Sequence, residues 1–150
     1  MMTEISFYHL HRSPLEDVLP RLLEKTLESG KHAVVMSGSA ERVESLNNVL
    51  WTYKKDSWLP HGSAKDGEAG RQPIWLTVKD ENPNDAAFLF LTDGSQSGNV
   101  DSFERCFELF DGNDPDAVTV ARARWKNYQD AGHNVTYWSQ NDRGGWEKKD

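Results

Sequence analysis

The first fifty residues alternate between short apolar runs and segments with helical spacing. Residues 4–10 are rich in aromatic and branched side chains, and residues 15–27 carry leucines three and four positions apart. Residues 31–36 form a second apolar run, and a helical pattern follows Ser39. Strands that alternate with helices pair in parallel, because each helix returns the chain to the same end of the sheet. The order predicts an α/β fold with a mostly parallel sheet and helices packed on its faces.

Capping residues, prolines and glycines indicate where the helices are expected to begin and end. Ser13 precedes Pro14, and Glu16 follows three positions after the serine, which predicts Ser13 as the N-cap of the first helix. Gly30 is the expected stop of that helix. In the same way, Asp114 and a following proline open the last helix, and a glycine at position 132 closes it.

The rest of the chain divides into strands and loops within one predicted domain, residues 1–150. Residues 59–73 form a long polar loop, and residues 74–78 and 86–91 are two further strands joined by a turn at 82–85. We predict a short helical turn from 103 that passes into a strand around 106–110. A final short strand is expected at 134–138, followed by a loose C-terminal tail at about 139–150.

Charge and composition exclude several classes of function. A formal net charge of −7 argues against direct nucleic-acid binding, since phosphate contacts need an excess of Lys and Arg. The single cysteine rules out a disulfide framework. The N-terminus does not resemble a signal peptide, and no apolar run approaches the roughly 20 residues that span a bilayer. We therefore expect a cytoplasmic protein that does not bind membranes.

Enzyme and cofactor motifs are not found. The turn after the first strand, His11 to Pro14, has no glycine, and Gly38 alone is far weaker than a dinucleotide fingerprint. His9 and His11 share one side of a strand, but no third metal ligand stands at suitable spacing. Cys106 lies among phenylalanines and is more typical of a core residue than of a nucleophile. We predict no cofactor, no metal and no catalytic residue.

Two aromatic segments remain as candidates for binding. Trp51 and Trp58 stand seven residues apart before a Pro-His-Gly turn, and they are compatible with either a core edge or a pocket. Val118, Arg122 and Trp125 share one face of the last helix. That face is either an ordinary amphipathic surface or a site where a guanidinium pairs with a carboxylate beside a ring.

The chain resembles the chi subunit family of bacterial DNA polymerase III. The resemblance rests on Leu50-Trp51 followed by Trp58-x-Pro-His, and on further matches at residues 5–10, 39–51, 71–74, 107–114, 121–126 and 131–133. It implies a Rossmann-like three-layer fold without a nucleotide site. It also implies a non-catalytic accessory subunit of the clamp-loader complex, which binds the acidic C-terminal tail of single-stranded DNA-binding protein and pairs with the psi subunit.

The resemblance also places the tail-binding residues. Arg122 matches the arginine that pairs with the terminal carboxylate of the tail, and a set of aromatic and apolar positions surrounds its last ring: Trp51, Trp58, Phe110, Val118 and Trp125. Trp51, Trp58 and Arg122 should then approach one cleft. Because some relatives carry Lys near position 118, the positive rim is either thinner in this chain or supplied in part by Arg124 and Lys126. The extension at 144–148 lies beyond the matching pattern.

Two other functions stay open as alternatives. A nucleotide-dependent enzyme would use the edge of the sheet where the parallel strands end. A direct single-strand binder would stack its tryptophans on bases, although the net charge weighs against it.

Overall fold

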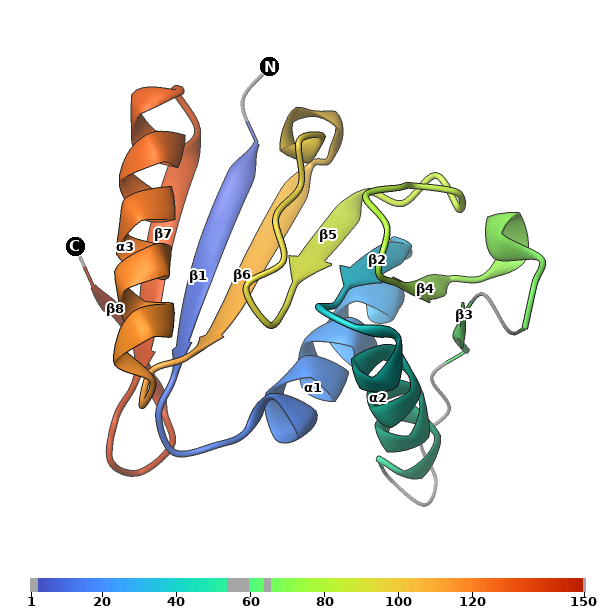
Figure 1. Ribbon diagram of the computed structural model, residues 1–150, viewed down its shortest axis with the longest axis horizontal. Helices are drawn as coiled ribbons and strands as arrows, with labels where there is room; N and C mark the ends of the chain where they lie inside the picture. The colour runs from blue at the N-terminus through green and yellow to red at the C-terminus, as the bar shows by residue number, and fades with distance from the viewer. Residues whose placement is uncertain (1–2, 54–59, 64–65, 150) are drawn as a thin grey trace.

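The computed structural model describes residues 3–53, 60–63 and 66–149. Within them, one sheet of eight strands has the order β3-β4-β2-β5-β6-β1-β7-β8. All neighbouring strands pair in parallel except β7 and β8, which are antiparallel. This confirms the predicted α/β fold with a mostly parallel sheet (Figure 1).

The elements follow the expected alternation. In chain order they are β1 (Glu4–Leu10), α1 (Leu15–Glu28), β2 (Ala33–Met36), α2 (Ala40–Thr52), β3 (Gly62–Ser63), η1 (Ala69–Arg71), β4 (Ile74–Thr77), β5 (Phe88–Leu91), η2 (Val100–Ser102), β6 (Arg105–Asp111), α3 (Pro115–Asp130), β7 (Asn134–Gln140) and β8 (Trp146–Lys149).

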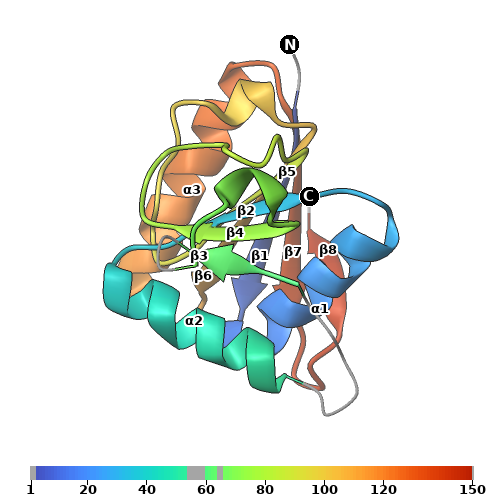
Figure 2. The same cartoon turned by 90° about the vertical axis from the view of Figure 1, so that its right-hand side faces the viewer.

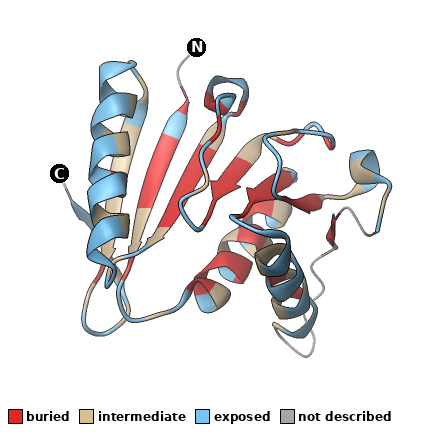
Figure 3. Ribbon diagram, viewed as in Figure 1, coloured by how far each residue is buried: buried red, intermediate tan, exposed pale blue. Residues whose placement is uncertain are grey.

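Helices cover both faces of the sheet and give the molecule three layers. Figure 2 shows α3 on one side of the sheet and α1 and α2 on the other. Successive residues of β1 serve the two sides in turn, as strand geometry requires. Ile5 and Phe7 join the core beneath α3, whereas Tyr8 and Leu10 join the core beneath α1 and α2. The central strands are buried, and the outer surface of α3 is exposed (Figure 3).

Most predicted helix ends are confirmed, but the start of α1 differs. Ser39 Oγ accepts from the Arg42 backbone N–H at 3.1 Å, and Asp114 Oδ1 accepts from the Asp116 N–H at 3.0 Å. The prediction of Ser13 as a cap is wrong, because Pro14 occupies the N-cap position and has no side-chain hydrogen bond to offer. The Ser13 hydroxyl instead accepts from Gln140 Nε2 at 3.0 Å.

The C-terminal segment also departs from the prediction of a loose tail. Trp146–Lys149 pairs with β7 as the edge strand β8, and Gly144 makes the turn between them at φ +83°. Burial explains the added strand, since the Trp146 ring packs at right angles against Tyr8 with centroids 5.1 Å apart. In addition, the helical turn expected from 103 lies slightly earlier, at η2, and the loop 59–73 contains β3 and η1.

Candidate functional site

The helix α3 presents a narrow apolar stripe to the sheet and leaves the rest of its surface in solvent. Ala121 is its fully buried residue, and Trp125 and Tyr128 pack partly buried against the same core. Arg122 is exposed beside this stripe. The helix therefore holds a cation at the rim of an aromatic layer.

The aromatic layer beneath α3 is built by three strands. Phe110 at the end of β6 lies 6.0 Å from the Tyr137 ring of β7 and 5.1 Å from the His9 ring of β1, measured between centroids. Tyr137 in turn stacks on Phe7 at 6.2 Å. His9 Nδ1 and the Tyr137 hydroxyl are joined by a hydrogen bond of 2.8 Å. Stacked rings on neighbouring strands make a fixed floor for an apolar guest.

Arg122 lies close enough to this floor for its charge to act on two of the side chains. Burial raises the pKa of Tyr137, and the positive charge of Arg122 partly offsets that shift. Burial, with smaller contributions from His11 and Arg122, lowers the pKa of His9 and favours the neutral imidazole. Four of the predicted site residues, Phe110, Val118, Arg122 and Trp125, thus lie on or beside α3.

Sequence reasoning missed His9 and Tyr137 as members of this site. Their placement follows from the sheet order, which sets β7 beside β1 and pairs Phe7 with Tyr137 and His9 with Ser139 in register. No spacing within the sequence reveals that order. Gly112 completes the arrangement: a Cβ at this position would overlap the His9 ring and lie 2.6 Å from the Leu10 carbonyl oxygen. Only glycine therefore permits the imidazole to lie where it does.

Arg124 does not take part in a positive rim, because its side chain is engaged within the chain. Its guanidinium donates to Glu108 Oε1 at 2.9 Å and to the carbonyl oxygens of Ser95 and Gly94. The side chains of Arg124 and Glu108 are only 12% and 8% exposed. Tyr128 donates to the second oxygen of Glu108 at 2.9 Å, and burial together with that carboxylate raises its pKa. This buried network attaches α3 to β6 and leaves no charge for a ligand.

The structure does not bring Trp51 to Arg122. Trp51 is 57% exposed at the end of α2, where its ring lies 4.5 Å from the ring of His61. α2 packs on β3 and β4, whereas α3 packs on β6, β1 and β7 on the opposite face. Five strand spacings of about 4.8 Å separate β4 from β7, or about 24 Å. Trp58 lies outside the described residues. A single cleft that contains both Trp51 and Arg122 is therefore not formed.

A crevice of about 780 Å³ opens where β1 and β6 end, and Phe110, Ala121 and Arg124 are among the residues that line it. These strands are neighbours, and the helices that follow them pack on opposite faces of the sheet. In α/β folds this switch point is the usual ligand site. Here, however, the backbone N–H groups of His11, Arg12 and Ser13 all point at Gln140 Oε1, at 3.2, 2.8 and 2.9 Å. The donors that would hold a phosphate already have an internal acceptor.

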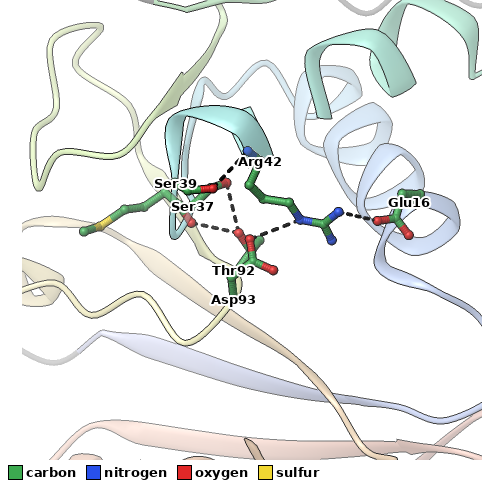
Figure 4. A network of polar contacts seen from close by, with 7 residues as sticks. Glu16, Ser37, Ser39, Arg42, Thr92 and Asp93 are labelled. Atoms are coloured by element: carbon green, nitrogen blue, oxygen red, sulfur yellow. Dashed lines mark hydrogen bonds and ion pairs between the residues drawn. The ribbon is translucent and has the colours of Figure 1, made fainter. Parts of the chain in front are cut away.

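The arginine on the other side of the crevice is likewise engaged (Figure 4). Arg42 at the start of α2 pairs with Glu16 of α1 at 2.6 Å and with Asp93, after β5, at 3.1 Å. Nearby, the Thr92 hydroxyl donates to Ser37 at 3.0 Å. These contacts connect the helices to the carboxyl edge of the sheet and neutralise the cation within the chain.

Other site types find no support in the part of the chain that the structure describes. No group of three or more His, Cys, Asp or Glu residues is placed to hold a metal. Cys106 is fully buried, and that burial raises the pKa of its thiol far from the range of a nucleophile, in agreement with the core interpretation. Among the same residues, no helix is both long and apolar enough to cross a bilayer.

Comparisons with known proteins identify the family. The pattern of the family described as "DNA polymerase III chi subunit, HolC" matches residues 2–136. A curated relative named "Probable DNA polymerase III subunit chi", from Rickettsia prowazekii (strain Madrid E), is 34% identical over 90 residues. The match covers 60% of this chain and 54% of that relative, so it spans about half of the relative's length.

Solved structures with similar folds are distant in sequence. The crystal structure of T4 UvsW superposes with a TM-score of 0.64 at 10% identity and covers 93% of this chain and 42% of that one. The C-terminal domain of the DEAD-box protein Dbp5 gives a TM-score of 0.54 at 12% identity, over 91% of this chain and 90% of that one. At such identities the likeness concerns the fold alone.

Proposed function

Because the chain belongs to the DNA polymerase III chi subunit family, we propose that it is a non-catalytic accessory subunit of the polymerase III clamp-loader complex. In this role it binds the acidic C-terminal tail of single-stranded DNA-binding protein and links that protein to the replicase in the cytoplasm. Pairing with a psi subunit, where one is present, attaches it to the clamp loader. It acts by binding, without a reaction and without direct contact to DNA.

The observation that carries the proposal is the exposed Arg122 beside the rings of Phe110, Trp125 and Tyr137. The tail ends in an aromatic residue with a free carboxylate, preceded by several aspartates. A guanidinium matches the geometry of a carboxylate, and the neighbouring rings offer an apolar surface to the terminal side chain. No other residue of the described chain forms an ion pair with Arg122, so its charge is available to a ligand.

This assignment uses four of the six residues that the family resemblance indicates. Trp51 lies on the other side of the sheet, so the aromatic partners of the tail are taken from the strands beneath α3 instead. Lys126, exposed on α3, adds a further cation at this end of the molecule. Salt should weaken the interaction, because exposed charges are screened over about 8–10 Å at ordinary ionic strength.

A titration of a fluorescent tail peptide tests the proposal. Arg122→Ala should weaken binding about tenfold or more, since a hydrogen bond to a charged group contributes about 1.5–3 kcal/mol. Arg71→Ala is the matched control, because Arg71 is an exposed arginine of η1 with an 83% exposed side chain. A peptide that lacks its final aromatic residue should not bind. If wild type and Arg122→Ala bound the peptide with equal affinity at low salt, the assignment of the tail site to Arg122 would be wrong.

A second candidate function is a nucleotide-dependent enzyme. The crevice at the ends of β1 and β6 supports it, because α/β folds usually bind their ligands at this position. The occupied backbone donors around Gln140 weigh against it. The test is the melting temperature with ATP, NAD or Mg²⁺, where a clear rise would support nucleotide binding over tail binding.

A further inference from the structure

Arg105, at the start of β6, is a half-buried arginine that has no carboxylate partner among the described residues. Its guanidinium carbon lies 4.7 Å from the ring centroid of Phe107 and 5.6 Å from that of Phe88. The single hydrogen bond of the side chain in the described structure is a long one, 3.5 Å from Nη2 to Ser6 Oγ. Its Nε is buried without a hydrogen-bond acceptor. Aromatic packing therefore holds the guanidinium in place, and its charge is left without a counterion.

The other half-buried arginines show how this chain normally treats such a charge. Arg42 pairs with two carboxylates, and Arg124 pairs with Glu108 and two carbonyl oxygens. Glu4 is the register partner of Arg105, yet no ion pair joins the two side chains. A desolvated cation without a partner is unfavourable, and an anion from outside the chain would relieve that cost.

Besides its register partner Glu4, the residues on the same face as Arg105, further along β1 and its neighbours, are hydrogen-bond donors and rings. Tyr8 stacks on Phe107 at 6.1 Å and meets Trp146 edge-on. Strand register sets Trp138 beside Tyr8 and Lys148 beside Trp138, and register partners point to the same side of a sheet. The hydroxyl of Tyr8 and the indole N–H groups of Trp138 and Trp146 find no acceptor in the described part of the chain.

We propose that this surface, the Arg105 face (Tyr8, Arg105, Trp138, Trp146 and Lys148), binds an acidic segment of a partner protein. A carboxylate of that segment pairs with the Arg105 guanidinium, and an apolar side chain further along the segment packs on the tryptophans. Donors without acceptors select an anion, and the planar guanidinium fits a carboxylate in two hydrogen bonds. The net charge of −7 favours a short acidic segment over a nucleic acid, whose dense phosphates would be repelled more strongly.

The Arg105 face is distinct from the proposed tail site on α3. Tyr8, Trp146 and the ring beneath Arg105 belong to the core on the α1 and α2 side of the sheet, whereas Phe110, Trp125 and Tyr137 belong to the core on the α3 side. Trp138 and β8 follow residue 136, where the match to the family ends. The two surfaces can therefore be tested independently.

The test is a nuclear magnetic resonance titration of the full-length, ¹⁵N-labelled protein with a short peptide of alternating Asp and Leu. The peptide is acetylated and amidated, so that it lacks the free carboxylate that the tail offers to Arg122. The readout is the indole N–H signals of Trp138 and Trp146 and the Nε–H signal of Arg105. The Asp peptide should move these signals, and the same peptide with Asn in place of Asp should not.

Substitutions assign the effect to the guanidinium. Arg105→Gln should weaken binding about fivefold, as expected for a partly exposed charged pair, and Lys148→Gln should weaken it less. Arg122→Gln, on the other face, is the matched control and should leave the titration unchanged. If Arg105→Gln does not fold, two other measurements test the proposal. They are the difference in binding between the Asp and Asn peptides and the affinity of the exposed Lys148→Gln variant.

Three results would overturn the proposal: equal shifts from the Asp and Asn peptides, a folded Arg105→Gln variant that binds as wild type does, or stronger shifts of the same signals with oligothymidylate. The last result would assign the surface to single-stranded nucleic acid. A failure of tail binding at Arg122 would leave all of these outcomes unaffected, because the readout and the probe do not involve that residue.

Discussion

The arginines in the crevice at the ends of β1 and β6 differ from Arg122 on the surface of α3 in whether they form ion pairs within the chain. In the crevice, Arg42 and Arg124 are bound to carboxylates of the same chain, and the backbone donors of the β1–α1 loop are bound to Gln140. On α3, Arg122 has no ion pair within the described chain. The contrast shows that the side chains and backbone donors at the usual ligand site of an α/β fold are engaged within this chain, whereas Arg122 on the helix surface has no such ion pair among the described residues.

The largest expected effect comes from the buried pair of the crevice. Arg124→Ala leaves Glu108 as an unpaired carboxylate at 8% exposure, and we expect it to lower the free energy of unfolding by about 3 kcal/mol or more. Urea unfolding measures the loss, with Arg122→Ala as the matched control, expected within about 0.5 kcal/mol of wild type. Similar losses for the two variants would show that the proposed division between scaffold and site does not exist.

A smaller effect is expected at the loop that carries the backbone donors. Gln140→Ala removes the acceptor of three partly buried N–H groups, and we expect the free energy of unfolding to fall by about 1 kcal/mol, the usual net contribution of a hydrogen bond. Gln129→Ala, at an exposed position on α3, is the control for loss of a glutamine side chain. Inorganic phosphate should then raise the melting temperature of Gln140→Ala but not of wild type. If Gln140→Ala were as stable as wild type, the hydrogen bonds of Gln140 to the β1–α1 loop would not contribute to stability.

The smallest expected effect is a pH dependence on the α3 side. The folded-state pKa of His9 is depressed, mainly by burial, so the folded protein favours the neutral ring. Stability from this group is complete above its unfolded pKa of about 6.5 and is lost as pH falls through the folded value. Tail affinity should change in the opposite direction, because protonated His9 adds positive charge near Arg122.

Parallel unfolding and tail titrations of wild type and His9→Gln, at about pH 7.5 and below the unfolded pKa of about 6.5, check this prediction. His9→Gln should reduce the pH dependence of both the free energy of unfolding and the tail affinity relative to wild type. Identical pH profiles of the two proteins would show that His9 does not titrate with folding.

Much of the fold could be predicted from the sequence, because the relevant signals are local. Helix caps at Ser39 and Asp114 and the two-residue alternation of β1 depend on neighbours in the chain. The start of α1 was mispredicted since Ser13 serves a distant partner, Gln140, that no local pattern reveals. The strand β8 was missed for a similar reason: its one aromatic ring, the partly buried Trp146, packs against Tyr8 of β1.

The candidate site was predictable in part. Helical spacing placed Val118, Arg122 and Trp125 together, because that relation is fixed within one helix. Strand neighbours such as His9 and Tyr137 depend on sheet order, and sequence spacing does not give that order. Trp51 was assigned to the wrong side for the same reason, since α2 and α3 pack on opposite faces.

The position of Gln140 has a practical consequence for any shortened version of this protein. The match to the family ends at residue 136, which makes that residue an obvious place to cut the chain. Such a fragment would lose the second half of β7, all of β8 and the acceptor that holds the loop after β1. A weaker interaction measured with it would report damage to the N-terminal scaffold rather than a direct contribution of the missing residues, so comparisons of affinity should use the full chain.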